Sequence, residues 1–418
     1  LAQETEKNHE DILEQADETD AMFGELYSWY LRNPEYRSRV QKLVQSAFAG
    51  KPKDIISQSV AKALYGEVSP YSATRLERFA ACAFAHFLQY GMKLTERVEY
   101  EFKPMDMGNV MHEALESFAE EVRKRGMKWT ELTEQERNEI ADRCLDNIVA
   151  DYGNTVLKSS ARNEYMIERT RRILRRTVWA LQKQLEQGEF QPEGFEVTFG
   201  GGRIDRVDIM EDQNKVYVKV IDYKTGNTSF DLVYLYHGLQ LQLMIYLDGA
   251  LRVEQKKYPD KEIIPAGVFY YNIKDPMIQE KIDADVEAVS AGLMKELKMN
   301  GLVQADPELV YRMDSSLGSI PVAFNKDGSF RKNSSVADRT QFAVLGRYVR
   351  TKIEKIRSSI LEGDAEVSPY ELGKKNACTY CPYMTVCGFD RRLSGYEFRR
   401  LKNFSDEELW KAFDREAE

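Results

Sequence analysis

Two aspartates and a lysine near the middle of the chain have the spacing of a metal-dependent hydrolytic site. Asp205 lies in an alternating apolar–polar segment, residues 203–210, and Asp222 and Lys224 lie at the end of a second one, residues 215–223. Such alternation predicts two β-strands. Clustered carboxylates supply the oxygen ligands that Mg²⁺ or Mn²⁺ prefers, and a lysine beside them can orient a water or stabilise developing charge.

The turn between these strands decides whether the three side chains meet. It is expected at residues 211–214, and with the turn centred on that segment Asp205 lies opposite Val220 and diagonal to Asp222. Because side chains alternate along a strand, both carboxylates and the lysine then share one face. The alternative is an exposed hairpin whose acids and lysine pair in solvent, where ion pairs contribute little.

The remaining periodicity predicts a mixed α/β fold around this hairpin. Apolar residues recur at helical spacing in several segments, and alternation marks further strands. Helices are expected at residues 108–124, 134–152, 164–187, 233–250, 281–298 and 336–361, and further strands at residues 195–199 and 266–272. The result would be a short mixed sheet enclosed by helices.

The five cysteines divide into four and one. Cys378, Cys381 and Cys387 fall within ten residues, and Cys82 stands far upstream. Four thiolates would suit a [4Fe-4S] cluster or a zinc site, and the spacing alone does not decide between them. Such a centre would link the two ends of the domain and restrict the unfolded chain. Cys144 falls in an expected amphipathic helix, and we interpret it as a buried, unreactive residue.

A basic helix is expected at residues 164–187. Arg171, Arg172, Arg175 and Arg176 cover more than one of its faces, and no acid lies between residues 169 and 183. The arginines could follow a DNA backbone, since phosphate contacts give affinity without sequence information. They could equally form a solvated face or dock an acidic neighbour.

The overall composition indicates a globular protein, but its negative net charge argues against a nucleic-acid ligand. The chain has 418 residues, 43% of them hydrophobic, with a formal charge of −9 and five cysteines, so disordered and disulfide-framework classes are excluded. A negative balance argues against nucleic acid, but the acids gather in the N-terminal segment and the arginines cluster elsewhere. No segment predicts a membrane span or a signal peptide, and the expected compartment is the cytoplasm. The first residue is Leu1, and we expect the chain to be part of a longer one.

Four short motifs in order give the sequence a resemblance to a known family. Gly-x-x-Asp and Asp-x-Lys on consecutive strands resemble the core of the PD-(D/E)XK nuclease superfamily. The preceding Gly108-Asn-Val-Met-His112 and the following Gln242-Leu-Met-Ile-Tyr246 are similar to motifs of its RecB-like group. A group of short motifs in the right order is much more specific than any one of them.

The resemblance assigns roles to these positions. It implies that Asp205, Asp222 and His112 ligate Mg²⁺ or Mn²⁺, with the backbone carbonyl of Tyr223 as a further ligand. Lys224 would position or activate the attacking water. Gln242 and Tyr246, four residues apart on one helical face, would face the active site or the DNA strand.

The wider resemblance extends from about residue 69 to about residue 400. The Ser72-to-Cys82 segment and the cysteine spacing are similar to the C-terminal nuclease part of the AddB component of AddAB helicase-nucleases, which implies a [4Fe-4S] cluster on Cys82, Cys378, Cys381 and Cys387. It also implies a single-strand DNA exonuclease, with 5′ to 3′ polarity, that processes double-strand breaks with an AddA-type partner.

These expectations divide the chain into three parts. Residues 1–68 would be a helical lead segment broken at Asn33-Pro34, residues 69–400 the nuclease domain and residues 401–418 a C-terminal helix. Two alternatives remain open: a Cas4-like free-standing single-strand nuclease, or a non-catalytic DNA-binding or assembly module. The lead segment favours a component of a larger complex, and the complete set of acids, lysine and histidine favours an enzyme.

Overall fold

The structure, a computed structural model, describes residues 20–47, 55–66, 72–95, 104–151, 160–200, 202–278, 285–393 and 395–417. Two compact units are present: residues 1–54 with 389–397, and residues 55–388 with 398–418. In the smaller unit a helix at residues 20–32 is separated at Asn33 from α2 (Pro34–Ala47), where the sequence predicts a break. Pro34 explains the interruption, because proline lacks the N–H that would continue the preceding helix.

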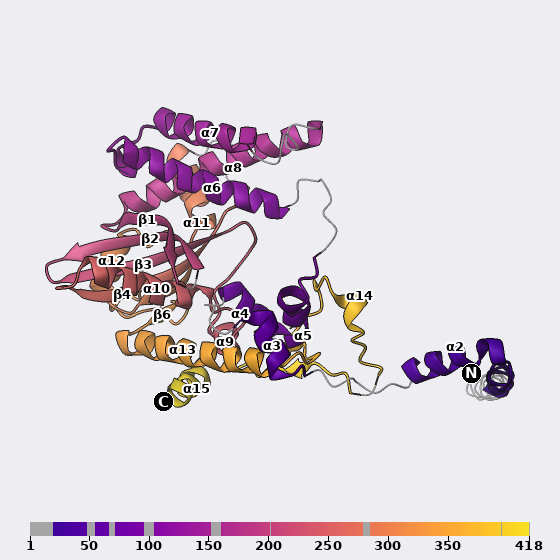
Figure 1. The fold of residues 1–418 in the computed structure, drawn as a ribbon. Coiled ribbons are helices and arrows are strands. Elements are labelled where there is room, and N and C mark those ends of the chain that lie inside the picture. The colour runs from indigo at the N-terminus through magenta and orange to yellow at the C-terminus, as the bar shows by residue number, and fades with distance from the viewer. Residues whose placement is uncertain are drawn as a thin grey trace, which may run out of the picture. The chain divides into compact units, whose positions relative to one another are not determined.

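A six-stranded mixed sheet forms the centre of the larger unit (Figure 1). Its strands follow the chain order, and the β3–β4 and β5–β6 pairs are parallel while the other pairs are antiparallel. The strands are β1 (Gln191–Phe199), β2 (Gly202–Asp212), β3 (Lys215–Lys224), β4 (Glu262–Asn272), β5 (Asn300–Gln304) and β6 (Val336–Ala337). This mixed α/β architecture confirms the predicted fold class.

The register between β2 and β3 differs from the prediction by two residues. Val207, not Asp205, pairs with Val220, because the turn contains only Gln213 and Asn214. Gln213 has φ of 46°, as two-residue hairpin turns require. Extending the observed register places Asp205 directly opposite Asp222. A shift of two residues keeps every side chain on its predicted face, so the error left the composition of the site unchanged.

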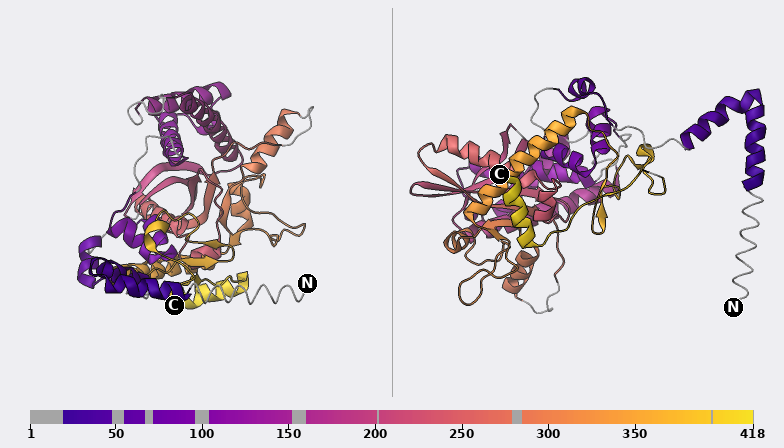
Figure 2. Two further views of the ribbon diagram at one scale, coloured as in Figure 1. Left: turned by 90° about the vertical axis from the view of Figure 1, so that its right-hand side faces the viewer. Right: turned by 90° about the horizontal axis from the view of Figure 1, so that it is seen from below.

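Three helices cover one face of the sheet (Figures 1 and 2). They are α6 (Pro104–Lys124), α7 (Glu134–Asp151) and α8 (Ala161–Glu186), each within a few residues of its predicted range. Their buried apolar residues join those of the sheet in one large core, which includes Phe118, Leu145 and Leu174 from the helices and Ile221 and Phe269 from the strands. The short helices η2 (Trp129–Glu131), α11 (Val286–Glu296) and α12 (Pro307–Met313) adjoin this layer.

A second group of helices covers the opposite face. It comprises α3 (Gln58–Tyr65), α4 (Ala73–Ala81), α9 (Leu232–Tyr236), α10 (Gln242–Lys257), α13 (Arg339–Glu362) and α15 (Asp406–Ala417). The single helix predicted at residues 233–250 is wrong, because α9 ends before Gly238, which has φ of 78° and lies against Ala80. A left-handed glycine ends one helix and lets the chain turn into the next. α3 packs against α13, so residues 55–66 lie with the larger unit.

The cysteine-containing segments lie near the two ends of this unit's chain. α5 (Ala83–His86) and η1 (Phe87–Gly91) follow Cys82, while β7 (Tyr370–Leu372), β8 (Lys375–Asn376), α14 (Met384–Cys387) and β9 (Arg399–Arg400) surround the other three. The Phe84 N–H donates to the Glu366 carbonyl, and the Tyr383 hydroxyl donates to the Leu94 carbonyl, at 3.0 Å in each case. Direct hydrogen bonds therefore join the early and late segments.

Among the helices that the structure describes, none is long and apolar enough to cross a lipid bilayer.

Candidate active site

The two strands of the hairpin and α6 bring the predicted acids and histidine together at one end of the sheet. Asp205 Oδ2 accepts the backbone N–H of Tyr223 at 2.7 Å and lies 3.4 Å from His112 Nδ1. Asp222 Oδ2 lies 2.6 Å from Lys224 Nζ. α6 reaches this end because Gly108 lies against Thr225, directly after Lys224.

Both aspartates are withdrawn from solvent. Asp205 is 8% exposed and Asp222 is 1% exposed, which excludes the hairpin whose charges pair in solvent. Burial, followed by the charge of Asp205, raises the pKa of Asp222 to about 7, although Lys224 opposes the shift. Two carboxylates that repel each other in a buried site favour a shared cation.

His112 lies at the edge of the site and not in the core. Its side chain is 29% exposed, and Nδ1 lies between Asp205 and Glu196 Oε1, the latter at 3.8 Å. Burial alone would lower the pKa of His112, but the two carboxylates outweigh it and raise the pKa to about 10. The histidine therefore compensates negative charge that a metal ion would otherwise neutralise.

Glu196 on β1 is a site residue that the sequence reasoning missed. One of its oxygens faces His112, and the other forms an ion pair of 2.5 Å with Arg203. Its backbone has φ of 49°, a conformation that non-glycine residues adopt at a cost. His112, Glu196 and Asp205 each place one potential ligand atom within 4.8 Å of the others. No sequence signal marks Glu196, because it alternates with apolar residues like any outward strand position.

Lys224 is held by a chain of hydrogen bonds that starts on α10. Lys224 Nζ donates to Gln242 Oε1 at 2.7 Å, and Gln242 Nε2 donates to the Tyr246 hydroxyl at 2.9 Å. The ammonium group also lies 5.4 Å from the centroid of the Tyr270 ring. Gln242 and Tyr246 thus lie on the face of α10 that meets the site, as their spacing of four residues predicts.

Glu77 on α4 fixes the start of α10. Its Oε1 accepts the backbone N–H groups of Leu241 at 2.7 Å and Gln242 at 2.9 Å. These are N–H groups that a helix cannot satisfy internally, and Leu241 itself supplies no capping side chain. Burial raises the pKa of Glu77 to about 7, although both N–H groups favour its charged form. The sequence reasoning missed this residue, because the contact spans more than 160 residues.

A separate buried ion cluster lies on the other face of the hairpin. Arg206 binds Asp208 through two hydrogen bonds of 2.5 and 2.9 Å, and Lys219 Nζ lies 3.0 Å from the same carboxylate. The Tyr223 side chain is buried on this face, and its ring meets the His112 ring edge to face, with centroids 6.0 Å apart. The Tyr223 carbonyl as a metal ligand stays a prediction. The cluster therefore joins β2 to β3 on the face of the hairpin opposite the active site.

The donor set fits a divalent cation. Asp222 Oδ2 is buried, and its contact with Lys224 lacks hydrogen-bond geometry, so a lone pair remains unused. The carboxylates of Asp205 and Glu196 and the ring nitrogen of His112 add oxygen and imidazole donors. Mg²⁺ and Mn²⁺ bind such oxygen-rich sets, and Mn²⁺ accepts imidazole.

Comparison with known proteins decides the family. The family model described as the PD-(D/E)XK nuclease superfamily matches residues 70–388. The chain belongs to this nuclease superfamily. The Asp205, Asp222 and Lys224 positions of this nuclease fold therefore lie within the matched range, together with His112, Gln242 and Tyr246.

Relatives of this nuclease come from several bacteria, and each is the B component of an ATP-dependent helicase/deoxyribonuclease. The chain is 41% identical to the protein from Lachnoclostridium phytofermentans, over 96% of the chain and 36% of that protein. The proteins of the same name from Thermoanaerobacter sp. and Alkaliphilus metalliredigens are each 34% identical, over 96% and 95% of the chain and 37% of each protein. The nuclease chain thus spans just over a third of the length of these relatives.

The four predicted cluster cysteines of the nuclease lie in one region. Cys82 and Cys381 belong to the same small hydrophobic cluster. Burial raises the pKa of Cys378 to about 12, and the other three thiols add to this shift. Within the described residues, however, no three cysteine sulfurs lie within 4.8 Å of one another. Cys144 is buried in the main core, apart from this region.

Three of the four predicted DNA-binding arginines of α8 have acidic partners within the chain. Arg171 contacts Asp142 and Asp146 of α7, and Arg175 also binds Asp142. Arg172 contacts an aspartate that follows β4, and Arg176 lies over the Trp179 ring. Two of the four thus dock the acidic face of α7, one of the alternatives that the sequence left open. Contact of these arginines with DNA stays a prediction.

Proposed function

We propose that this chain is the nuclease part of an AddB-type protein and hydrolyses phosphodiester bonds of a single DNA strand with Mg²⁺ or Mn²⁺. The observation that carries the proposal is the meeting of Asp205, Asp222, Lys224 and His112 at one buried end of the sheet. A non-catalytic module would gain nothing from two buried carboxylates that repel each other, since such a pair costs stability.

Each side chain has a distinct role in the proposed reaction. Asp205, Asp222 and His112 would hold the divalent cation, with Glu196 as an additional donor, and the cation supplies Lewis-acid stabilisation of charge on the scissile phosphate. Lys224 would orient the attacking water, because contacts with Asp222 and Gln242 leave it at least one further N–H donor.

The resemblance and the relatives support a wider setting for this chemistry. The protein would act with an AddA-type partner on DNA ends at double-strand breaks in the cytoplasm, and the strand would be degraded from 5′ to 3′. The names of the relatives, which combine helicase and deoxyribonuclease, support a partner that moves along DNA. A [4Fe-4S] cluster on Cys82, Cys378, Cys381 and Cys387 would complete the domain.

Cleavage of labelled single-stranded DNA tests the site. The purified chain with Mg²⁺ should degrade the strand, and Asp222→Ala or Lys224→Ala should reduce the rate about a hundred- to a thousandfold, the scale of losing a central electrostatic group. The matched control is Lys332→Ala, which removes an exposed lysine from a loop. Unchanged cleavage in both site variants would refute the assignment.

Iron analysis and absorbance test the cluster. The [4Fe-4S] proposal predicts a brown protein with about four iron atoms per chain. Cys82→Ser should lower the unfolding free energy far more than Cys144→Ser. A colourless protein with one bound zinc ion would show that the cysteines hold zinc and not an iron–sulfur cluster. Equal losses of unfolding free energy in the two variants would refute the linking role of Cys82.

A further inference from the structure

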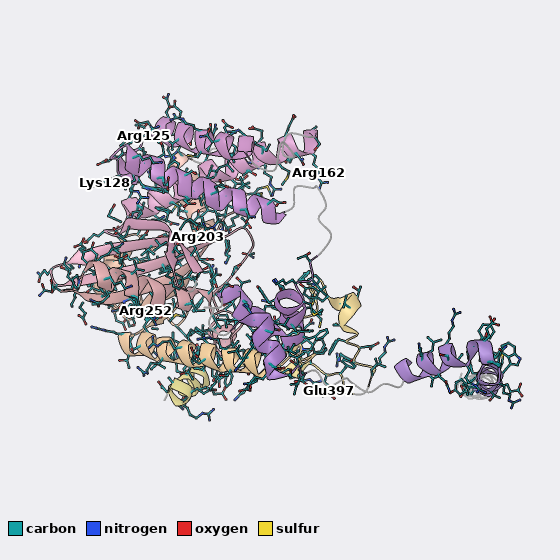
Figure 3. All side chains as sticks on the ribbon, in the orientation of Figure 1. Arg125, Lys128, Arg162, Arg203, Arg252 and Glu397 are labelled. Carbon is teal, nitrogen blue, oxygen red and sulfur yellow. The ribbon has the colours of Figure 1, made fainter. Side chains whose placement is uncertain are left out.

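A basic groove lies between α10 and α13 on the larger unit. It has a volume of about 530 Å³ and is lined by Arg252 and Lys256 from α10, by Arg350 and Arg357 from α13, and by Phe199 at the end of β1. Figure 3 places Arg252 on α10 between the sheet and α13. The active-site residues do not line this groove, so it is a separate surface feature.

The charge of the groove contrasts with that of the whole chain. Four cations and one carboxylate, Asp248, line the groove, and Glu354 pairs with one of the cations, Arg357, at 3.0 Å. This leaves two net positive charges in a chain whose formal charge is −9. Asp248 lies 2.6 Å from Arg252 and 2.8 Å from Arg350, and so holds the two guanidinium groups in place. A groove with this local excess of positive charge attracts a polyanion.

The groove cations are also open to solvent. The side chains of Arg252 and Arg350 are 68% and 52% exposed, although both pair with Asp248. Exposed guanidinium groups can exchange solvent for phosphate with little desolvation cost. The α10–α13 groove therefore offers accessible guanidinium groups to a phosphate backbone.

An aromatic contact joins the groove to the active site. The Phe199 ring meets the Tyr246 ring edge to face, with centroids 5.9 Å apart, and Tyr246 accepts the hydrogen bond from Gln242. Phe199 packs closely on α10 at Gly249. A methyl group added at Gly249 would come within 2.6 Å of the Phe199 ring. Six residues of helix, about 9 Å, separate Tyr246 from Arg252.

We propose that this groove binds the sugar–phosphate backbone of the strand that occupies the active site, with Phe199 as a stacking surface for a base. The proposal rests on the proposed function and names the path of its substrate. Cations that follow the backbone beside an aromatic ring are the general means of binding single strands without reading their sequence. The groove would therefore hold DNA of any sequence.

Binding measured without divalent cations tests the groove independently of cleavage. The whole chain is titrated against a fluorescein-labelled thirty-nucleotide thymidine strand in EDTA, between about 50 and 200 mM salt. The double variant Arg252→Ala, Lys256→Ala should weaken binding about 25-fold at about 0.1 M salt and reduce the slope of log K against log salt by about 1.4, since each phosphate contact in a single strand contributes about 0.7. Alanine is a good helix former, so α10 should persist.

The matched control is Lys326→Ala, Lys332→Ala, which removes the same charge from exposed loop positions. It should bind DNA within about twofold of the unchanged chain. Equal weakening by both double variants, or no weakening by either, would overturn the proposal, as would an unchanged chain that does not bind the strand. An oligoglutamate peptide serves as a second probe. If the groove double variant lost binding to this peptide but still bound DNA, the groove would take an acidic protein partner, and the proposal would be overturned.

The two proposals can fail separately. A chain that binds DNA through the groove but cleaves nothing with Mg²⁺ or Mn²⁺ would refute the proposed function and leave the groove intact. A chain that cleaves DNA but whose groove variant behaves like the loop variant would refute the groove alone.

Discussion

The substitution Glu77→Ala removes a contact that positions the active site from a distance. Glu77 Oε1 accepts both N–H groups at the start of α10, and the second of them belongs to Gln242, which binds Lys224. Without the carboxylate, these donors at the buried helix start lose their acceptor. A buried donor left unsatisfied costs about 1–3 kcal/mol, and a lost helix cap about 0.5–2 kcal/mol. We expect the unfolding free energy to fall by about 2–4 kcal/mol.

Activity should fall as well, for a separate reason. Displacement of the first turn of α10 moves Gln242 and loosens Lys224. Loss of about 1–2 kcal/mol of transition-state stabilisation corresponds to a reduction in kcat of roughly 5- to 30-fold. Glu77→Gln keeps a carbonyl oxygen in the same place and should retain most of both stability and kcat. This rescue distinguishes an acceptor that positions Gln242 from a charge that acts on the reaction.

The assays are urea unfolding followed by circular dichroism, and single-stranded DNA cleavage at saturating Mg²⁺ and substrate. Glu120→Ala is the matched control, because Glu120 pairs with Lys124 on an exposed helix surface and such pairs contribute about 0.3–0.5 kcal/mol. The reasoning fails if Glu77→Gln is as damaging as Glu77→Ala. It also fails if Glu77→Ala unfolds within about 0.5 kcal/mol of the unchanged chain.

Three further predictions concern stability. Asp222 and Glu77 each have a pKa of about 7 in the folded chain, above the ordinary value, so the folded state binds more protons. In metal-free protein, the contribution of these two groups to stability should therefore be lost as pH rises from about 4 through 7. Relative to the unchanged chain, Asp222→Asn should gain unfolding free energy over this range, and a constant difference between the two in EDTA would contradict the prediction. Gly301→Ala would overlap the Val268 carbonyl oxygen and should cost about 1–3 kcal/mol in thermal unfolding, whereas an unchanged melting temperature would contradict the packing. Asp208→Asn leaves two buried cations without their carboxylate and should cost about 3–5 kcal/mol; a loss below about 1 kcal/mol would show that water reaches them.

Local patterns predicted the elements whose periodicity is strong. The helices α6, α7 and α8 and the hairpin of β2 and β3 lie within a few residues of the predicted ranges, because each has one continuous apolar face. The hairpin register was wrong, since turn length depends on backbone conformation at Gln213, which residue type does not reveal. The side chains nevertheless keep their faces, because an error of two residues matches the strand period.

Contacts between distant segments explain what the sequence did not reveal. Asp205, Asp222 and Lys224 lie on neighbouring strands, so pairing rules alone bring them together. Glu77 and Glu196 reach the site from α4 and β1, and nothing in their immediate neighbours distinguishes them from solvated acids. Five-residue β5 and two-residue β6 were missed because strands this short carry too little alternation to detect.

The hydrogen bonds between early and late segments cannot form until most of the chain has been synthesised. The Leu94 carbonyl and the Tyr383 hydroxyl that binds it are separated by 289 residues. A ribosome that adds about 5–20 residues per second needs roughly 15–60 s to make that stretch. α10, which holds the partners of Glu77, is made a little past the middle of this interval, whereas α13 is made only near its end. The face of α4 that packs on α13 stays uncovered until then. A nascent chain stalled before its last hundred residues would therefore carry every predicted metal ligand, but it would lack α13 and three of the four predicted cluster cysteines.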